Sequence, residues 1–291
     1  MDIRKILEKH ITERVNAQVG QRIQTANPTE IEVRKKQSMN VARKAQIIKS
    51  TAIIQISNVE ENDDKTIVLY TLQMRDIVKQ GEQIYAEEYE EERKAIVQNG
   101  HVIHDVLLTP IQEVEPSEDE LSFADDARNT RFVYDRRAAV RYAEQWWNDY
   151  NPKYKKFEND CTNFISQCLH AGGAPMTGYP NRGKGWWMQN NSWSYSWSVA
   201  HSLRLYLANS KSGLRAVEKR SASELMPGDV ICYDFEGDGR FNHNTMVVAK
   251  DANGMPLVNA HTTNSRMRYW SYEDSTAYTP NIQYKFFHIV G

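Results

Sequence analysis

The chain has 291 residues, of which 40% are hydrophobic and 25% are charged. This composition is typical of a globular protein, and it excludes a disordered tail, a collagen and a coiled-coil rod. The length is sufficient for two domains that each bury a hydrophobic core. The net charge of −2 gives no basis for expecting a nucleic-acid partner.

The sequence contains no apolar run near the length of about 18 residues that a transmembrane helix needs, so no membrane partner is expected. The first ten residues alternate charged and apolar side chains. They lack the apolar centre and the small-residue cleavage site of a secretory signal. We therefore expect a cytoplasmic protein, or one that is exported non-classically or associated with a spore.

The three cysteines are Cys161, Cys168 and Cys232. An odd number of cysteines without a secretory signal argues against a disulfide framework. Because no CxxC pair is present, a structural zinc site is not expected either, and we predict no cofactor and no metal. Each cysteine is therefore either part of a core or a reactive thiol.

Composition changes along the chain. The first 130 residues are acidic overall and the rest are basic, while all tryptophans and cysteines lie beyond position 140. We predict a first domain over residues 1–112, an acidic linker over 113–131 and a second domain over 132–291. The tryptophans and cysteines indicate that the function resides in the second domain.

The first domain is expected to be a small α+β domain. Apolar residues at helical spacing predict a helix over 1–18, and a polar stretch extends to about 40. Asn99-Gly100 is a strong two-residue hairpin signal. The shape resembles a cystatin-like or NTF2-like fold, with the acidic run Glu88–Glu92 on a solvated strand edge. The predicted strands cover residues 45–59, 65–80 and 81–98, and a further strand follows Gly100.

No chemical constellation is evident in residues 1–112. This domain could cover an active site, act as a pro-region or bind a protein partner.

Helices precede strands in the second domain, an order typical of an α+β fold. Asp135 is a suitable N-cap for a helix that reaches Trp147, and Gly172-Gly173 ends a second helix. The expected helices cover residues 134–147, 161–169 and 196–209, and the expected strands cover 228–233, 245–249, 257–261 and 283–290.

Cys161 is the candidate nucleophile because it falls in the first turn of a predicted helix. The partial positive charge and the free N–H groups of a helix start stabilise a thiolate. A backbone N–H there can also contribute to an oxyanion hole. A thiolate nucleophile also needs a proton acceptor and a group that orients this acceptor.

His243 is the leading candidate for that base. If Gly254 closes a three-residue loop, residue 247 opposes Asn259 and residue 245 opposes His261, so that His243, Asn259 and His261 share one face. A loop of two or four residues would place Asn259 and His261 on the face opposite to His243. The proposed triad therefore depends on the parity of this loop.

Several motifs of the second domain resemble those of a known family. Residues 159–169 (NDCTNFISQCL), followed by 227–230 (PGDV), 242–243 (NH) and 260–262 (AHT), resemble the bacterial putative amidase domain family. The resemblance covers about 132–291. It implies a papain-like fold related to NlpC/P60 and CHAP cysteine peptidases. It further implies that Cys161 is the nucleophile, His243 the base and His261 the orienting residue, with Asn259 as the alternative third member.

Two other features have competing interpretations. Asp234, Glu236 and Asp238 match the start of a calcium loop, but the acid expected at its twelfth position is a threonine. A polar turn is therefore the simpler interpretation of this segment. Trp186 and Trp187 belong to an aromatic cluster that could bind substrate or could form a hydrophobic core.

These observations predict a cysteine-dependent amidase or peptidase that acts on a peptide or a cell-wall-type amide such as a peptidoglycan stem peptide. Cys161, His243 and His261 are the expected catalytic residues, and Trp186 and Trp187 the expected substrate contacts. A non-catalytic glycan- or peptide-binding module is the alternative from another class. Acyl transfer by the same thiolate is a third possibility.

Overall fold

The computed structural model describes residues 2–21, 28–62, 64–108 and 132–291, which form two compact units. The first unit comprises the described residues up to 108 together with Asp251–Asn253 and Thr263–Tyr278. The second comprises residues 132–250, Gly254–Thr262 and Thr279–Gly291. The predicted linker at 113–131 lies outside the described residues. The first unit thus takes two short segments from the range expected to belong wholly to the second domain.

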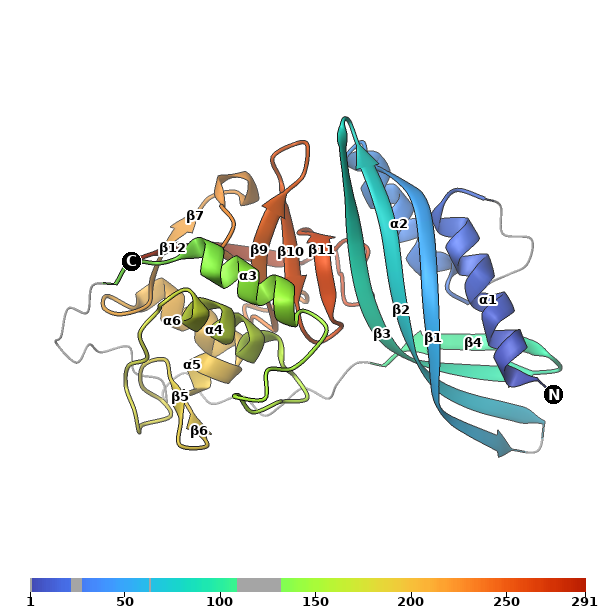
Figure 1. Cartoon of the computed structure of the whole chain (residues 1–291), viewed down its shortest axis with the longest axis horizontal. Helices are drawn as coiled ribbons and strands as arrows, with labels where there is room; N and C mark the ends of the chain where they lie inside the picture. The colour runs from blue at the N-terminus through green and yellow to red at the C-terminus, as the bar shows by residue number, and fades with distance from the viewer. Residues whose placement is uncertain (1, 22–27, 63, 109–131) are drawn as a thin grey trace. The chain divides into compact units, whose positions relative to one another are not determined.

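The first unit is an antiparallel sheet with two helices on one face (Figure 1). The strands follow the order β1-β2-β3-β11, and β4 also pairs with β3. β11 enters this sheet because Ser265 and Arg266 pair with Tyr89 and Glu88. The elements are α1 (Ile3–Gln18), α2 (Glu30–Ala42), β1 (Gln46–Asn62), β2 (Lys65–Gln80), β3 (Gln83–Gln98), β4 (His101–Leu107) and β11 (Ser265–Tyr269).

Strict alternation of side chains builds the core of this unit. Every second residue of β2 is buried, including Val68, Tyr70 and Leu72, and these side chains belong to one cluster with Leu7 and Ile11 of α1. The predicted hairpin after β3 is confirmed: Gln98 pairs with His101 across the two-residue loop. Both loop residues have positive φ, as this turn requires.

Helix α2 falls in the polar stretch for which we expected no regular element. Its buried residues are Val33, Lys36, Met39 and Asn40, so only half of the buried face is apolar. The periodicity of apolar residues is therefore too weak to reveal the helix.

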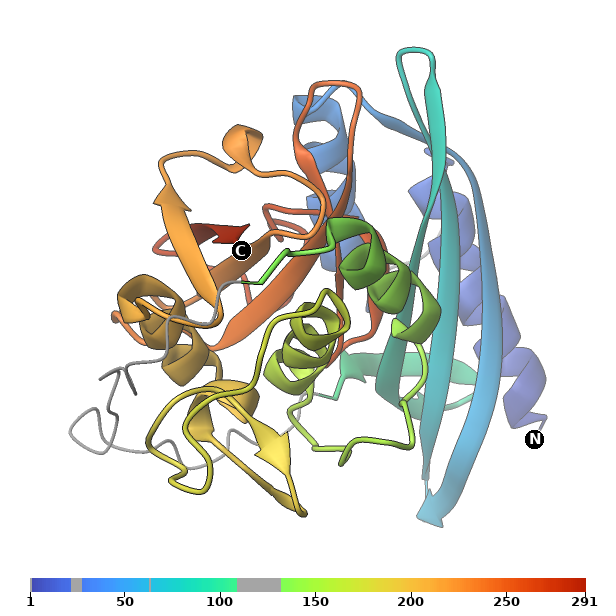
Figure 2. The same ribbon diagram turned by 60° about the vertical axis from the view of Figure 1, so that its left-hand side comes forward.

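The second unit is also α+β, as expected from its sequence. Its antiparallel strands follow the order β10-β9-β8-β12-β7. The green helices α3 and α4 lie side by side against β9 and β10 (Figure 2). The larger elements are α3 (Arg136–Trp146), α4 (Cys161–Ala171), α6 (Ala200–Asn209), β7 (Arg215–Lys219), β8 (Val230–Asp234), β9 (His243–Lys250), β10 (Pro256–Ala260) and β12 (Gln283–Val290). The short elements are β5 (Met188–Gln189), β6 (Ser192–Trp193) and α5 (Tyr195–Ser198).

The β9–β10 register decides which residues share a face. Pro256 pairs with Lys250 and Leu257 with Ala249, as the three-residue loop predicted. A β-bulge then shifts the pairing, so that Asn259 opposes Met246. Because side chains alternate along a strand, Asn259 lies on the face of Met246 and His243 on the other. The expectation that Asn259 shares a face with His243 is therefore wrong.

Among the helices described here, none has the length and the apolar character needed to cross a membrane.

Candidate active site

Cys161 is the first residue of α4, as its sequence context predicted. The cysteine is buried, with 5% of its surface exposed, whereas Cys168 and Cys232 are fully buried. All three thiols are free. Asp160 occupies the N-cap position of the helix, but its side chain makes no capping hydrogen bond to the helix backbone. Its carboxylate has other partners, which connect the start of α4 to the end of β10.

Two hydrogen-bond donors face the thiol. The Thr162 hydroxyl oxygen lies 3.7 Å from the Cys161 sulfur, and the backbone N–H of Asn244 also points to it. The side-chain amide of Asn244 donates to the Thr162 hydroxyl at 3.0 Å. Because that hydroxyl accepts from Asn244, its own proton is available to the sulfur.

The electrostatic balance at Cys161 differs from the expectation of a thiolate stabilised by the helix start. Burial is the largest effect and raises the pKa of the thiol. Hydrogen bonds from Thr162 and Asn244 act in the opposite direction, while the negative charge of Asp160 raises the pKa further. The resting form is therefore a protonated thiol, and a reaction at Cys161 requires a base.

His243 is the first residue of β9 and directly precedes Asn244, whose N–H faces the thiol. Its buried ring lies 5.6 Å from the ring of Tyr233 and 6.1 Å from that of Phe235. The structure thus brings the beginning of β9 to the beginning of α4. The two predicted residues come from adjoining parts of one site.

The two ring nitrogens of His261 face Asp160 and Trp146. Its Nδ1 lies 2.7 Å from the Asp160 carboxylate and its Nε2 lies 2.6 Å from the carbonyl oxygen of Trp146. Both ring nitrogens therefore have buried oxygen partners, which fix the orientation of the ring. Phe164 stacks on the ring at 4.0 Å. The expectation that His261 orients His243 directly is corrected: His261 holds Asp160.

Asp160 links the residues on either side of the catalytic cysteine candidate. Its Oδ1 accepts the backbone N–H of Phe157 at 3.0 Å and the amide of Asn163 at 2.9 Å. The backbone N–H of Asp160 donates to the Thr262 hydroxyl at 2.9 Å. Together with His261, these contacts fix the start of α4 and hence the position of the sulfur.

Asn259, the alternative third member of the triad, has a different function in the structure. Its side-chain amide donates to the carbonyl of Ala143 at 3.2 Å and to the carboxylate of Glu144 at 2.8 Å. These hydrogen bonds tie β10 to α3.

Trp186 and Trp187 are completely buried. The indole N–H of Trp186 donates to Ser166 at 2.9 Å, and that of Trp187 donates to the carbonyls of Asn181 and Lys184. Both rings therefore pack inside the unit, and the core interpretation replaces the expected role as substrate contacts.

The candidate calcium loop is a polar turn. The Asp234 carboxylate accepts the backbone N–H groups of Gly237, Asp238 and Gly239, so its oxygens satisfy the turn. Among the described residues, no group of three or more His, Cys, Asp or Glu side chains could hold a metal ion.

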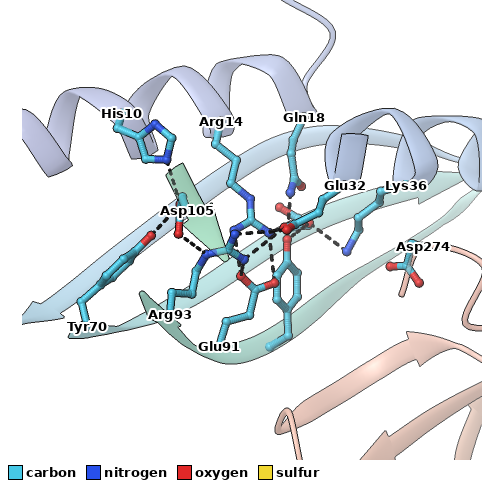
Figure 3. A network of polar contacts seen from close by, with 12 residues as sticks. His10, Arg14, Gln18, Glu32, Lys36, Tyr70, Glu91, Arg93, Asp105 and Asp274 are labelled. Carbon is cyan, nitrogen blue, oxygen red and sulfur yellow. Dashed lines mark hydrogen bonds and ion pairs between the residues drawn. The ribbon is translucent and has the colours of Figure 1, made fainter. Parts of the chain in front are cut away.

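The first unit contains a buried ionic network that the sequence did not reveal (Figure 3). Asp105 contacts His10 at 2.8 Å and Arg93 at 3.0 Å, and Glu91 contacts Arg93 at 2.6 Å and Arg14 at 2.7 Å. The network contradicts the interpretation of the Glu88–Glu92 run as a solvated edge, because Glu91 faces inward.

A second part of this network surrounds Lys36 of α2. Its ammonium lies 2.8 Å from Glu87 and 3.2 Å from Asp76, and all three groups are buried. Every charge is paired, so the network fixes how α1 and α2 lie on the sheet. In β3, the network acids Glu87 and Glu91 alternate with Tyr85 and Tyr89 at every second position. This period of two could have indicated that the acids are buried.

A family model described as "Putative amidase domain" matches residues 133–287, which include Cys161 and His243. The chain belongs to this family. No solved structure gives a significant match.

Two relatives come from Bacillus subtilis strain 168. The uncharacterized protein YhbB is 52% identical over 306 aligned residues, which cover 100% of this chain and 97% of YhbB. The uncharacterized protein YjcM is 31% identical over 139 residues, which cover 45% of this chain and 31% of YjcM. The similarity to YhbB therefore includes the first unit as well as the amidase region.

Proposed function

We propose that this member of the amidase family is a cysteine-dependent amide hydrolase with a papain-like catalytic unit. Cys161 is the nucleophile and His243 is the general base. The main support for the proposal is the position of Cys161 at the start of α4, where the backbone N–H of Asn244 points to its sulfur. His243 stands one residue before that N–H, at the start of β9.

The reaction would proceed in two halves. His243 accepts the thiol proton as the Cys161 sulfur attacks the amide carbonyl, and free N–H groups at the start of α4 stabilise the resulting oxyanion. The amine leaves with the proton returned by His243, and a thioester remains on Cys161. Water then attacks the thioester, gives a proton to His243 and releases the acid, after which the thiol recovers its proton.

The raised pKa of Cys161 is compatible with this order of events. A protonated thiol is inert until a base removes its proton, so the proton moves during attack rather than before it. In this proposal His261 is a positioning residue. It acts through Asp160, and Asp160 holds the beginning of α4.

We propose a peptide or a cell-wall-type amide, such as a peptidoglycan stem peptide, as the substrate class. A protein partner could bind through residues 1–112, where the buried network gives the helices a fixed presentation. Hydrolysis and transfer of the acyl group to an amine use the same thioester. Product analysis with added amines distinguishes the two outcomes.

The proposal is tested with the full chain and a library of blocked peptides and muropeptide fragments, with amine release as the readout. Cys161→Ser should abolish release, and His243→Asn should lower it by about a thousandfold or more, as removal of a catalytic base does. Cys168→Ala and Cys232→Ala are matched controls and should retain activity. Equal activity of Cys161→Ser and the unaltered protein would refute the proposal.

The burial of Cys161 and its raised pKa also favour a second candidate, a non-catalytic module in which this thiol is inert. In that case no peptide is cleaved, and Cys161 reacts with electrophiles no faster than expected from its small exposed surface. The library experiment and labelling of Cys161 therefore separate the two functions.

A further inference from the structure

The second unit contains a recess of about 340 Å³ beside the segment that leads to Cys161. One wall is the stretch from Lys155 to Glu158, and the other includes Trp193 of β6. The remaining lining residues are Arg182, Tyr195, Ser198 and Val199. Three of the lining side chains are cationic, whereas Glu158 is the single acid among them.

Aromatic rings hold two of these cations in place. The Lys155 ammonium lies 4.6 Å from the centre of the Trp193 ring, and the Arg182 guanidinium lies 5.3 Å from the same ring. Arg182 also lies 4.9 Å from the Tyr195 ring and donates from Nε to the Trp193 carbonyl at 3.1 Å. Cation–π contacts of this kind orient a side chain and leave its N–H donors available.

No carboxylate within the described residues forms an ion pair with Lys155, Lys156 or Arg182. The ammonium of Lys156 lies over the ring of Tyr150 at 3.8 Å. The recess therefore presents several positive charges whose attraction for an anion is not satisfied by the protein. An arginine fork beside an ammonium group is well suited to a carboxylate.

The recess is physically connected to the candidate active site. The backbone N–H of Phe157, in the recess wall, donates to the Asp160 carboxylate. The carbonyl of Lys155 accepts from the side-chain amide of Asn163 on α4 at 2.9 Å. A group bound in the recess would therefore be held by the same segment that positions Cys161.

We infer that this recess binds a carboxylate of the substrate, so that the enzyme acts on acidic peptides. This inference rests on the proposed function, which identifies the bound ligand as a substrate. Lys155 and Arg182 supply the charge-assisted hydrogen bonds, and Trp193 fixes both side chains. The recess thus selects for a substrate that carries a negative charge.

The test measures binding in the full-length Cys161→Ser protein, which has no thiol nucleophile. The indole N–H signal of Trp193, identified by its loss in Trp193→Phe, is followed by NMR during titration. The matched probes are acetyl-Gly-Glu-amide and acetyl-Gly-Gln-amide, which differ by one charge, and inorganic phosphate is the third probe. We expect the acidic dipeptide to bind about tenfold more tightly than the neutral one.

Lys155→Gln and Arg182→Gln should each weaken binding of the acidic dipeptide about tenfold, whereas Lys211→Gln, an exposed lysine outside the recess, should not. Equal binding of the two dipeptides by the Cys161→Ser protein would by itself overturn the inference, whatever the Lys155 and Arg182 variants show. Binding of phosphate alone would also overturn it, because the recess would then be a phosphate site. Because the Cys161→Ser variant lacks the proposed nucleophile, the binding results do not depend on whether Cys161 catalyses hydrolysis.

Discussion

The Nδ1 atom of His261 lies 2.7 Å from Oδ2 of Asp160, the residue that directly precedes Cys161. Both groups are buried, and the other ring nitrogen of His261 contacts the carbonyl of Trp146. Removing one member of a buried hydrogen-bonded pair leaves the polar atom of the other without that partner. The pair therefore links the end of β10 to the position of the sulfur.

His261→Gln should lower the free energy of unfolding by about 1–3 kcal/mol, because the Asp160 carboxylate loses one of its buried hydrogen-bond partners. The double variant His261→Gln with Asp160→Asn should recover part of this loss, which a double-mutant cycle in urea measures. Amide hydrolysis should show a lower kcat with little change in KM, since the sulfur is displaced. Additive effects of the two substitutions would contradict the coupling.

Thr162→Val removes the hydroxyl that points to the Cys161 sulfur and keeps the shape of the side chain. The pKa of the thiol should rise further, because a hydrogen bond to the charged form is lost. The pH dependence of Cys161 alkylation, measured by peptide mass spectrometry, should shift upward accordingly. Thr162→Ser retains the hydroxyl and should leave the profile in place. A similar shift in Thr162→Ser would exclude this role for the hydroxyl.

Glu91 gives the first unit a defined dependence of stability on pH. Burial alone raises the pKa of Glu91, but Arg14 and Arg93 outweigh burial and lower it from 4.5 to about 2. Because the folded pKa is depressed, the stabilisation is complete above pH 4.5 and disappears as the pH falls towards 2. Urea unfolding of the full chain between pH 6 and pH 2 measures this loss.

Glu91→Gln should destabilise the first unit by about 3 kcal/mol at pH 7 and should flatten this acid dependence. Glu92→Gln is the matched control, since Glu92 is exposed and its neighbour is Thr71. Its effect should stay within about 0.5 kcal/mol. An equally steep acid dependence in Glu91→Gln would show that Glu91 is not its source.

Two tryptophans should respond differently to truncation. Trp186→Ala empties a fully buried site and should cost about 3–5 kcal/mol of unfolding free energy. Trp193→Ala removes a half-buried ring at the recess and should cost about 1 kcal/mol, with a larger effect on binding of acidic peptides. Thermal and urea unfolding of both variants provide the comparison. A greater loss of stability in Trp193→Ala would contradict the assignment of Trp186 to the core.

The sequence was sufficient for elements whose signals are local. The strand predicted over residues 65–80 is β2, with the same bounds, and Asp135 caps α3 as expected. The place of Cys161 at a helix start followed from the composition of residues 159–169. These features depend on neighbouring residues along the chain, so they were accessible without coordinates.

Other features depend on distant parts of the chain. The β-bulge between Leu257 and Val258 has no evident local signal, and it alone moved Asn259 away from the face of His243. The pairing of His261 with Asp160 joins residues that are 101 positions apart. Likewise, the ionic partner of the buried Glu91 is Arg14, which lies 77 positions away along the chain.

In the proposed mechanism, Cys161 forms an acyl intermediate with the help of His243. The most direct measurement is peptide mass spectrometry of the full chain after brief reaction with p-nitrophenyl acetate, together with the burst of p-nitrophenol. We expect about one acetyl group per chain, located on Cys161, with much slower formation in His243→Asn and unchanged formation in Cys168→Ala. Acetylation that is absent from Cys161, or equally fast without His243, would contradict it.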